Sequence, residues 1–240
     1  MIKSLFKSIK NLLLLLLLLI LLVGGYFVSQ GYIMYKEAIE AVSLEEKIKN
    51  IKADEDYVTI DEVAINFKDA IISIEDKRFY EHFGVDIYSI FRALIKNFQE
   101  KDITGGGSTI TQQFARNMYF TQEQKLARKV AEVFVALDLE ANYEKDDIVE
   151  MYINVIYFGD GYNGIKEASI GYFDKNPIEL DLYESSLLAA IPNAPSIYQL
   201  SNKNKYTYIR QKLVLNSMKD NRNITSEELE EVLKHIKENE

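Results

Sequence analysis

Glu75 is the first residue of this sequence whose type and position could do chemistry. It follows an apolar stripe with the spacing of one helix face, formed by Val63, Phe67, Ala70, Ile71 and Ile74. At about 100° per residue, Glu75 lies one step round from Ile74, at the rim of the face that the stripe would bury. Partial burial raises the pKa of a carboxyl group, as a general acid or base near neutral pH requires. Periodicity alone favours a structural glutamate paired with Lys77 or Arg78, because most such rim carboxylates are structural.

A glycine-rich turn that leads into a helix is the second candidate. Three glycines at 105–107 precede Thr109 and Gln112, which have the spacing of a capping box that opens a helix. A helix N-terminus behind such a loop can hold a phosphate. No Gly-Lys-Ser/Thr follows, so the match to a phosphate-binding loop is poor. A flexible turn before a capped helix explains these residues equally well.

Two cations and a carboxylate form the third candidate. Arg128 and Glu132 are i, i+4 neighbours with Lys129 beside them, opposite a predicted stripe of Leu126, Val130, Val133, Phe134 and Leu137. The default interpretation is an ion pair on a solvated face, which stabilises by only a few tenths of a kcal/mol. The alternative is a carboxylate and two cations that face a cleft. Spacing does not choose between them.

The elements that must position these residues are helices, and the predicted body is predominantly α without a convincing run of alternating strands. A further stripe comprises Ile148, Met151, Tyr152 and Val155. Other helices are predicted at residues 86–99, 109–119, 163–171, 181–191, 204–219 and 226–238. Thr225 or Ser226 is the candidate cap of the last one.

The N-terminal segment predicts where the body lies. Leu12 to Val28 form a nearly unbroken apolar run, just long enough to cross a bilayer as a helix. Three preceding lysines keep the N-terminus cytoplasmic by the positive-inside tendency. No small-x-small cleavage pattern follows, so a retained single-pass anchor is preferred over a cleaved signal peptide. The rest of the chain is then expected outside the membrane.

Composition excludes several classes of function. The 240 residues contain no Cys, which excludes disulfides, thiolate metal sites and Cys nucleophiles. The formal net charge is −9. Without the three anchor lysines, Lys and Arg fall from 28 to 25 against 37 Asp and Glu, so the outer body carries −12. This acidity argues against nucleic-acid binding, and an anionic ligand would need a local cluster of cations.

Five strings in this order resemble the peptidoglycan glycosyltransferase domain, glycosyltransferase family 51, over about residues 58–220. The first motif resembles Glu75, Asp76, Phe79, His82 and Gly84. The second resembles the run from Gly106 to Gln113, and the third resembles Arg128, Lys129 and Glu132. A fourth is similar to the stretch from Ile148 to Gly159, and a fifth to the stretch from Glu184 to Tyr198. One motif could arise by chance, but five in register decide the resemblance.

The resemblance implies an all-α, lysozyme-like domain with two lobes, a head and a jaw, behind the transmembrane helix. It implies polymerisation of lipid II into β-1,4 glycan strands at the bacterial membrane, with inversion and release of undecaprenyl pyrophosphate. Glu75 would be the general base that takes the proton from the acceptor's 4-hydroxyl. Glu132 would assist at the donor, by supporting the leaving pyrophosphate or orienting a cation.

The remaining site residues are assigned by the same resemblance. Arg116, Arg128 and Lys129 would neutralise the pyrophosphate, where electrostatic stabilisation matters most. The others would position substrate or organise the first-motif loop: Thr109, Gln112, Gln113, Asn117, Asp76, Phe79 and His82. No organic cofactor is expected. The sequence shows no dedicated cluster of metal ligands and does not tell the metal requirement, and a divalent cation, Mg or Mn, is compatible with a pyrophosphate that it would bridge. The family often has Lys where this chain has Arg116, and a cation commonly found before the third motif falls on Gln124.

The expected organisation is a cytoplasmic N-terminus and anchor at 1–29, a stalk or linker at 30–57, the glycosyltransferase domain at 58–220 and a helical tail at 221–240. The segment from Phe83 to Phe120 would supply a mobile jaw that dips into the membrane interface, or else the core of a small lobe. The chain ends soon after this domain, so a monofunctional form is expected. Other proteins, such as penicillin-binding transpeptidases, would then cross-link the growing glycan.

Two rival functions have the same fold style. A lysozyme-type enzyme that cleaves glycan gives no reason for the Gln112–Gln113 and Arg128–Lys129 pairs. An inactive membrane scaffold is the non-enzymatic rival, and the presence of Glu75 and Glu132 argues against it.

Overall fold

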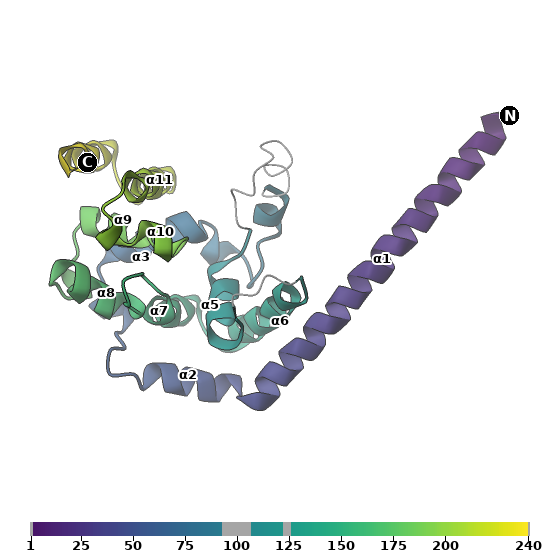
Figure 1. The fold of residues 1–240 in the computed structure, drawn as a ribbon, viewed down its shortest axis with the longest axis horizontal. Helices are drawn as coiled ribbons and strands as arrows, with labels where there is room; N and C mark the ends of the chain where they lie inside the picture. The colour runs from purple at the N-terminus through teal and green to yellow at the C-terminus, as the bar shows by residue number, and fades with distance from the viewer. Residues whose placement is uncertain (1, 93–106, 122–125, 240) are drawn as a thin grey trace.

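The computed structural model describes residues 2–92, 107–121 and 126–239. Within these ranges the protein is all-α, as predicted, and its β structure is an isolated antiparallel bridge between Tyr157 and Asn163. Figure 1 shows a body of short helices from which one long helix projects. The remainder of the helix predicted at 86–99, beyond the helical residues 87–92, lies outside the described ranges, as do Phe98 and Gln124.

The long helix is α1 (Ile2–Ala41), whose N-terminal side chains are exposed from residue 6 onward. It is the one helix in the described part of the chain that is long and apolar enough to cross a membrane. Its C-terminal end packs on α6 (Leu126–Asn142), where a Cβ on Gly31 would lie 2.5 Å from the Cβ of Val130. The hydroxyl of Tyr35 donates to Asp138 of α6 at 2.6 Å.

A second helix ties the predicted stalk to the body. α2 (Leu44–Lys52) begins at the cap Ser43, whose side chain accepts from the backbone N–H of Glu46. It buries Ile48 and contacts α7 (Lys145–Val155). The hydroxyl of Tyr57 then donates to Glu150 of α7 at 2.5 Å. Residues 30–57 are therefore packed against the body along most of their length.

The core forms where α3 (Ile65–Glu75), α5 (Ile110–Tyr119), α7 and α9 (Leu182–Ala190) meet. The predicted stripes of α3 and α7 face this core: Phe67, Ala70, Ile71, Ile148, Met151 and Tyr152 are fully buried. Burial of such side chains stabilises by about 1.5–3 kcal/mol each. The core therefore fixes the end of α3, where Glu75 stands.

The stripe predicted for α6 faces α1 instead of the core. The ring of Phe134 contacts the rings of Tyr32 and Tyr35, and Leu126 is 64% exposed. The opposite face of α6 is buried in the body and carries Ala131, Glu132, Val135, Ala136 and Leu139. The interpretation of Glu132 as part of an ion pair on a solvated face is therefore wrong, because α1 covers the apolar side of α6 and turns the other side inward.

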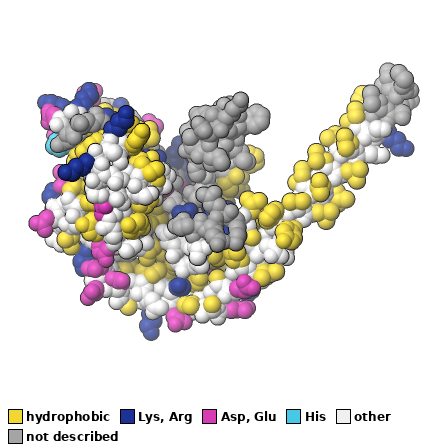
Figure 2. Space-filling model, viewed as in Figure 1, with side chains coloured by type: hydrophobic (Ala, Val, Ile, Leu, Met, Phe, Trp, Pro, Cys, Tyr) yellow, Lys and Arg dark blue, Asp and Glu magenta, His cyan; other side chains and the backbone are white. Residues whose placement is uncertain are grey.

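The C-terminal part completes the body with α8 (Gly164–Phe173), α10 (Pro195–Tyr198), α11 (Lys205–Asp220) and α12 (Ser226–Asn239). Short 3-10 turns lie at Ile60–Glu62, Phe79–Glu81, Pro177–Glu179 and Leu200–Asn202. The predicted cap of α12 is confirmed, since the backbone N–H of Glu228 donates to the Thr225 hydroxyl at 3.2 Å. Figure 2 shows a hollow beside the lobe that carries α10 and α11.

Candidate active site

Glu75 is the last residue of α3, and its side chain is only 8% exposed. The amide of Gln113 donates to its Oε2 at 2.8 Å. Arg210 donates from Nη2 to its Oε1 at 3.3 Å. These partners replace the pairing with Lys77 or Arg78 that periodicity favoured, and that interpretation is wrong. The carboxylate is therefore held from two sides by residues of α5 and α11.

A buried tyrosine orients the amide that contacts Glu75. The hydroxyl of Tyr152 donates to Gln113 Oε1 at 3.2 Å, which leaves the Nε2 of Gln113 to face Glu75. Burial, aided by the charge of Glu75, raises the pKa of Tyr152 well above its usual value. The phenol therefore stays protonated and acts as a donor at physiological pH. Tyr152 donates to Gln113, and Gln113 donates to Glu75.

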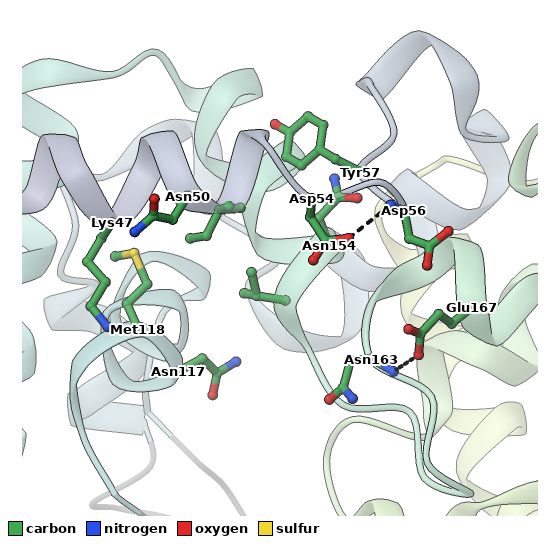
Figure 3. A pocket seen from close by; sticks show the side chains of 12 residues that line it. Lys47, Asn50, Asp54, Asp56, Tyr57, Asn117, Met118, Asn154, Asn163 and Glu167 are labelled. Atoms are coloured by element: carbon green, nitrogen blue, oxygen red, sulfur yellow. Dashed lines mark hydrogen bonds between the residues drawn. The ribbon is translucent and has the colours of Figure 1, made fainter.

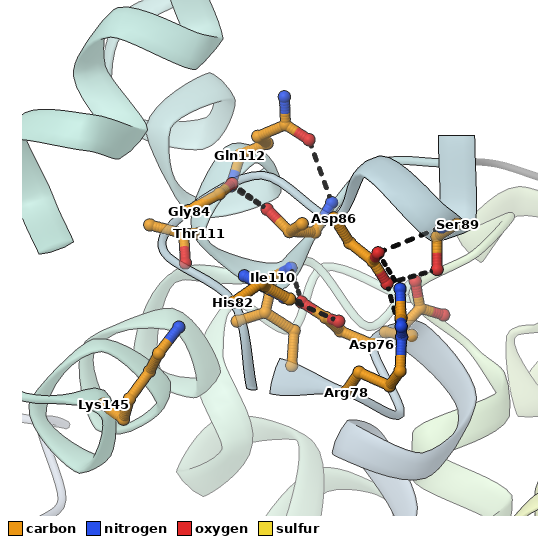
Figure 4. Close-up of polar contacts among 12 residues, drawn as sticks. Asp76, Arg78, His82, Gly84, Asp86, Ser89, Ile110, Thr111, Gln112 and Lys145 are labelled. Atoms are coloured by element: carbon orange, nitrogen blue, oxygen red, sulfur yellow. Dashed lines mark hydrogen bonds and ion pairs between the residues drawn. The ribbon is translucent and has the colours of Figure 1, made fainter. Parts of the chain in front are cut away.

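Asp76 joins the first motif to the start of α5, as Figure 4 shows. Its side chain is 3% exposed, and its carboxylate accepts from the backbone N–H of Ile110 at 3.0 Å. The Nε2 of His82 lies 3.0 and 2.9 Å from the two carboxylate oxygens. Phe79 is fully buried beside the His82 ring, with the ammonium of Lys145 4.4 Å from the centre of its own ring. These residues hold the loop that follows Glu75 in place.

Thr109 and Gln112 form the predicted capping box at the start of α5. The backbone N–H of Gln112 donates to the Thr109 hydroxyl at 3.1 Å, and the Gln112 side chain accepts from the Thr109 N–H at 3.1 Å. The Thr109 hydroxyl also donates to the carbonyl of Gly84 at 2.7 Å. Both side chains are almost completely buried, so their hydrogen bonds are used to build the framework of the site.

Gly84 turns the loop of the first motif against α6. Its φ is +77°, a conformation that favours glycine, and a Cβ there would lie 3.2 Å from the carbonyl oxygen of Ala136. Two residues later Asp86 accepts from the hydroxyl and the backbone N–H of Ser89 and from Arg78. Burial by itself would raise the pKa of Asp86, but these hydrogen bonds outweigh it and lower the pKa to about 2.

Glu132 is fully buried between two cations of its own helix. The Nζ of Lys129 donates to Glu132 Oε2 at 2.8 Å and also contacts the hydroxyl of Ser108. The Nε of Arg128 lies 3.3 Å from Oε1, within ion-pair distance but out of alignment for a hydrogen bond. The Lys129 side chain remains 40% exposed. The third motif thus meets the end of the glycine-rich loop, with one ammonium open to solvent.

The structure separates the two remaining predicted residues of α5. Arg116 is half-buried, and its Nε has no hydrogen-bond partner among the described residues. Arg116 lies three residues after Gln113, so the two share a face of α5. Asn117 is exposed and lines a different pocket of about 360 Å³ with Lys47, Asn50 and Asn154, shown in Figure 3. Asn117 is therefore not brought together with Glu75.

A polar cavity of about 260 Å³ opens beside Glu75. Its lining comes from the first motif, the glycine-rich loop and α11, and includes Glu75, Asp76, Asp86, Ser89, Arg92, Ser108, Thr109 and Ser217. Because Ser108 contacts Lys129, the cavity extends from the candidate base toward the cation cluster. This arrangement suits transfer of a proton to Glu75 beside a site for a negatively charged group.

A divalent cation does not fit the residues around Glu132. Both carboxylate oxygens face a cation, with Lys129 at 2.8 Å and Arg128 at 3.3 Å, and these charges repel a metal ion. In the described part of the chain no cluster of three His, Asp or Glu side chains is arranged to hold a metal.

Arg210 is the site residue that sequence reasoning missed. It lies within the helix predicted at 204–219 but outside the five motifs, 135 residues from Glu75. Its Nε is buried without a hydrogen-bond partner among the described residues, and its side chain is 18% exposed. A partly buried guanidinium against a carboxylate appears only when α11 is packed on α3.

Comparison with known proteins agrees with the resemblance. The family described as Transglycosylase matches residues 42–219. Penicillin-binding protein 1A of Aquifex aeolicus is 41% identical over 177 residues, which cover 74% of this chain and 24% of that protein. Penicillin-binding protein 1F of Bacillus subtilis is 42% identical over 174 residues, 71% of this chain and 24% of that protein. The chain thus spans about a quarter of the length of these relatives. Since the match covers most of its residues, the chain belongs to the transglycosylase family.

Proposed function

We propose that this protein is a peptidoglycan glycosyltransferase that polymerises lipid II into β-1,4 glycan at the outer face of a bacterial membrane. The observation that carries the proposal is the setting of Glu75. Its carboxylate is held by Gln113 and Arg210 at the wall of a cavity that is also lined by Ser108, whose hydroxyl contacts Lys129. A base beside a cation cluster fits a hydroxyl nucleophile and an anionic leaving group.

In the proposed reaction one proton is transferred, one glycosidic bond forms and one bond to pyrophosphate breaks. Glu75 accepts the proton of the 4-hydroxyl on the acceptor's N-acetylglucosamine as that oxygen attacks the anomeric carbon of the donor's N-acetylmuramic acid. The bond from that carbon to the pyrophosphate oxygen breaks, and the configuration inverts from α to β. The pyrophosphate leaves on undecaprenol with the bonding electrons, so negative charge develops on its oxygens.

Cations close to the cavity would receive that charge. Lys129 is the best placed, because its side chain is 40% exposed while its ammonium is held by Glu132 and Ser108. Arg128 and Arg116 would add positive charge from α6 and α5. Fixed cations need no reorganisation as the charge develops, which is the basis of electrostatic catalysis. In this scheme Glu132 acts through Lys129 and Arg128, by fixing their positions.

The anchor agrees with a substrate that stays in the bilayer. α1 has the length and composition of a transmembrane helix, and the lysines before the apolar run place its N-terminus in the cytoplasm by the positive-inside tendency. The body would then work on the outer surface, where the glycan grows. Penicillin-binding transpeptidases are the proposed partners that cross-link the product, in keeping with the names of the relatives.

The test is polymerisation of fluorescent lipid II by the detergent-solubilised full chain, beside Glu75→Gln and the control Glu231→Gln, an exposed residue of α12. We expect long glycan from the parent and the control, and none from Glu75→Gln with an unchanged melting temperature. Cleavage of finished glycan without polymerisation would identify a lysozyme-type enzyme. No turnover of either substrate would leave the scaffold as the better explanation.

A further inference from the structure

α11 carries an apolar stripe on its exposed face, next to Arg210 and Ser217, which border the cavity beside Glu75. Tyr206, Ile209 and Leu213 are 56%, 48% and 51% exposed, and their spacing of three and four residues places them on one helix face. The opposite face of α11 is buried against α3 and α9 through Thr207, Gln211, Val214, Leu215 and Met218. Helix formation and core packing therefore do not require apolar residues at the three exposed positions.

Positive charge surrounds this stripe in an otherwise acidic body. Residues 191–225 contain a single acidic residue, Asp220, and the cations Lys203, Lys205, Arg210, Lys212, Lys219 and Arg222. Arg210 is directed at Glu75, and the others are distributed along and beyond α11. A helix with an apolar face bordered by lysines is typical of one that lies in the interface of a membrane with anionic headgroups.

The position of α11 relative to α1 agrees with a membrane surface. Figure 1 shows α11 at the upper left of the body and the N-terminal end of α1 at the upper right, with helix 87–92 between them. That second helix exposes Ile87, Tyr88 and Phe91 by 63%, 76% and 62%. Figure 2 shows hydrophobic side chains on both the α11 lobe and α1. The apolar run of α1 would set where the bilayer lies, and α11 and helix 87–92 lie in the upper part of the body, toward the N-terminal end of α1 in this view.

We propose that the stripe Tyr206–Ile209–Leu213 rests in the outer surface of the same bilayer that α1 crosses, with the neighbouring lysines at anionic headgroups. The head lobe then contacts the membrane on one side of the hollow, and helix 87–92 contacts it on the other. The cavity beside Glu75 opens between two membrane contacts rather than beside one. A protein partner would also match the apolar stripe. The excess of lysines and the position of α11 in the part of the body toward which α1 projects favour the lipid surface.

Because the chain contains no Cys, single cysteines can report on depth in the full-length protein. Leu213→Cys carries an environment-sensitive fluorophore in vesicles of phosphatidylglycerol and phosphatidylcholine. Ile170→Cys, on α8 and 44% exposed, is the aqueous control, and Val23→Cys in the apolar run of α1 is the buried reference. We expect nitroxide-bearing lipids to quench Leu213→Cys several-fold more than Ile170→Cys and less than Val23→Cys, and aqueous iodide to give the reverse order.

Equal quenching of Leu213→Cys and Ile170→Cys by both quenchers would overturn the proposal. Protection from iodide without quenching by nitroxide lipid, varying with the ratio of protein to lipid, would overturn it in favour of a second copy of the chain. A Lys203→Glu/Lys205→Glu variant tests the role of charge. We expect it to lose nitroxide quenching at Leu213→Cys in anionic vesicles, and the result does not depend on whether the protein polymerises glycan.

Discussion

The guanidinium of Arg210 lies 3.3 Å from the carboxylate of Glu75, although 135 residues separate them in the chain. The contact exists because α11 packs on α3, whose last residue is Glu75. It fixes one carboxylate oxygen and leaves the other to Gln113 at 2.8 Å. Arg210 is therefore a positioning residue for the proposed base, supplied by the lobe opposite the glycine-rich loop.

Replacing Arg210 by Ala should lower kcat by about 10- to 100-fold with little change in KM, because a base that is free to rotate loses its attack geometry. Steady-state polymerisation kinetics test this. Arg210→Lys should recover part of the loss, since a cation remains but the planar guanidinium with its paired N–H donors is lost. An unchanged kcat in Arg210→Ala would contradict the positioning role.

Replacing Tyr152 by Phe removes a hydroxyl and keeps the ring in the core. The carbonyl oxygen of Gln113 is then left without its donor, which should destabilise the protein by about 1 kcal/mol, or about 2–4 °C in Tm. The amide of Gln113 becomes free to flip, so kcat should fall as well. Thermal melting and polymerisation rate are measured together, with Tyr206→Phe on the exposed face of α11 as the control. A lower Tm with full activity would separate the hydroxyl from catalysis.

Glu132 and Lys129 belong to the same ion cluster, so the loss of either should lower Tm. Glu132→Gln leaves Arg128 and Lys129 without a countercharge and should cost about 3 kcal/mol of stability. Lys129→Ala leaves the fully buried carboxylate of Glu132 without its hydrogen-bond donor, so it should lower Tm by a similar amount. It should also reduce kcat at temperatures well below Tm, because the partly exposed ammonium is lost. Melting curves and rates of both variants check this, and an unchanged kcat in Lys129→Ala would show that Lys129 is structural only.

Asp86 should make stability depend on pH in the acid range. Its pKa in the folded protein is about 2, below the ordinary value of 3.8, so its contribution is complete above about pH 4 and is lost as pH falls toward 2. The contribution is about 2 kcal/mol. Asp86→Asn should therefore lower the Tm at pH 7, and its difference from the parent should shrink at pH 3. Asp220→Asn, at the exposed end of α11, is the control. A constant difference between pH 7 and pH 3 would refute this.

Gly31 and Gly25 provide a matched pair within α1. A side chain at Gly31 would meet Val130 at 2.5 Å and the carbonyl of Ala127 at 2.8 Å, whereas one at Gly25 meets nothing within 4 Å. Gly31→Leu should destabilise the protein by about 1–3 kcal/mol through overpacking, and Gly25→Leu should not. Val130→Ala should relieve Gly31→Leu only in part, because the clash with the Ala127 backbone remains. Similar melting temperatures for both glycine variants would show that the helix contact is not formed.

Much of the fold follows from local pattern. The stripes of α3 and α7 face the core because their partners are in the body itself, and the capping box of Thr109 and Gln112 marks the start of α5 by local hydrogen bonds. The apolar stripe predicted for α6 does lie on one helix face, but periodicity does not say whether α1 or the body buries that face. Here α1 does, so Glu132 is turned inward.

The site is predictable only where its residues lie in motifs. Glu75 and Gln113 come together, and Lys129 contacts Ser108 in the lining of the same cavity, whereas Asn117 lies next to Arg116 in sequence and faces another pocket. One step along a helix turns a side chain by about 100°, so adjacent motif residues separate. Arg210 carries no local signal, because its partner is set by the packing of two distant helices.

Because α1 is continuous, the tilt of its apolar part is coupled to the orientation of the body. The helix runs from Ile2 to Ala41 without interruption, and its lower turns are fastened to α6, the helix of Glu132, by the Gly31 crossing and the bond from Tyr35 to Asp138. A membrane-spanning helix accommodates a change in bilayer thickness by changing its tilt. Because the body packs on that helix, the body would rotate with it in a thicker or thinner membrane. The angle between the cavity beside Glu75 and the membrane surface would then change.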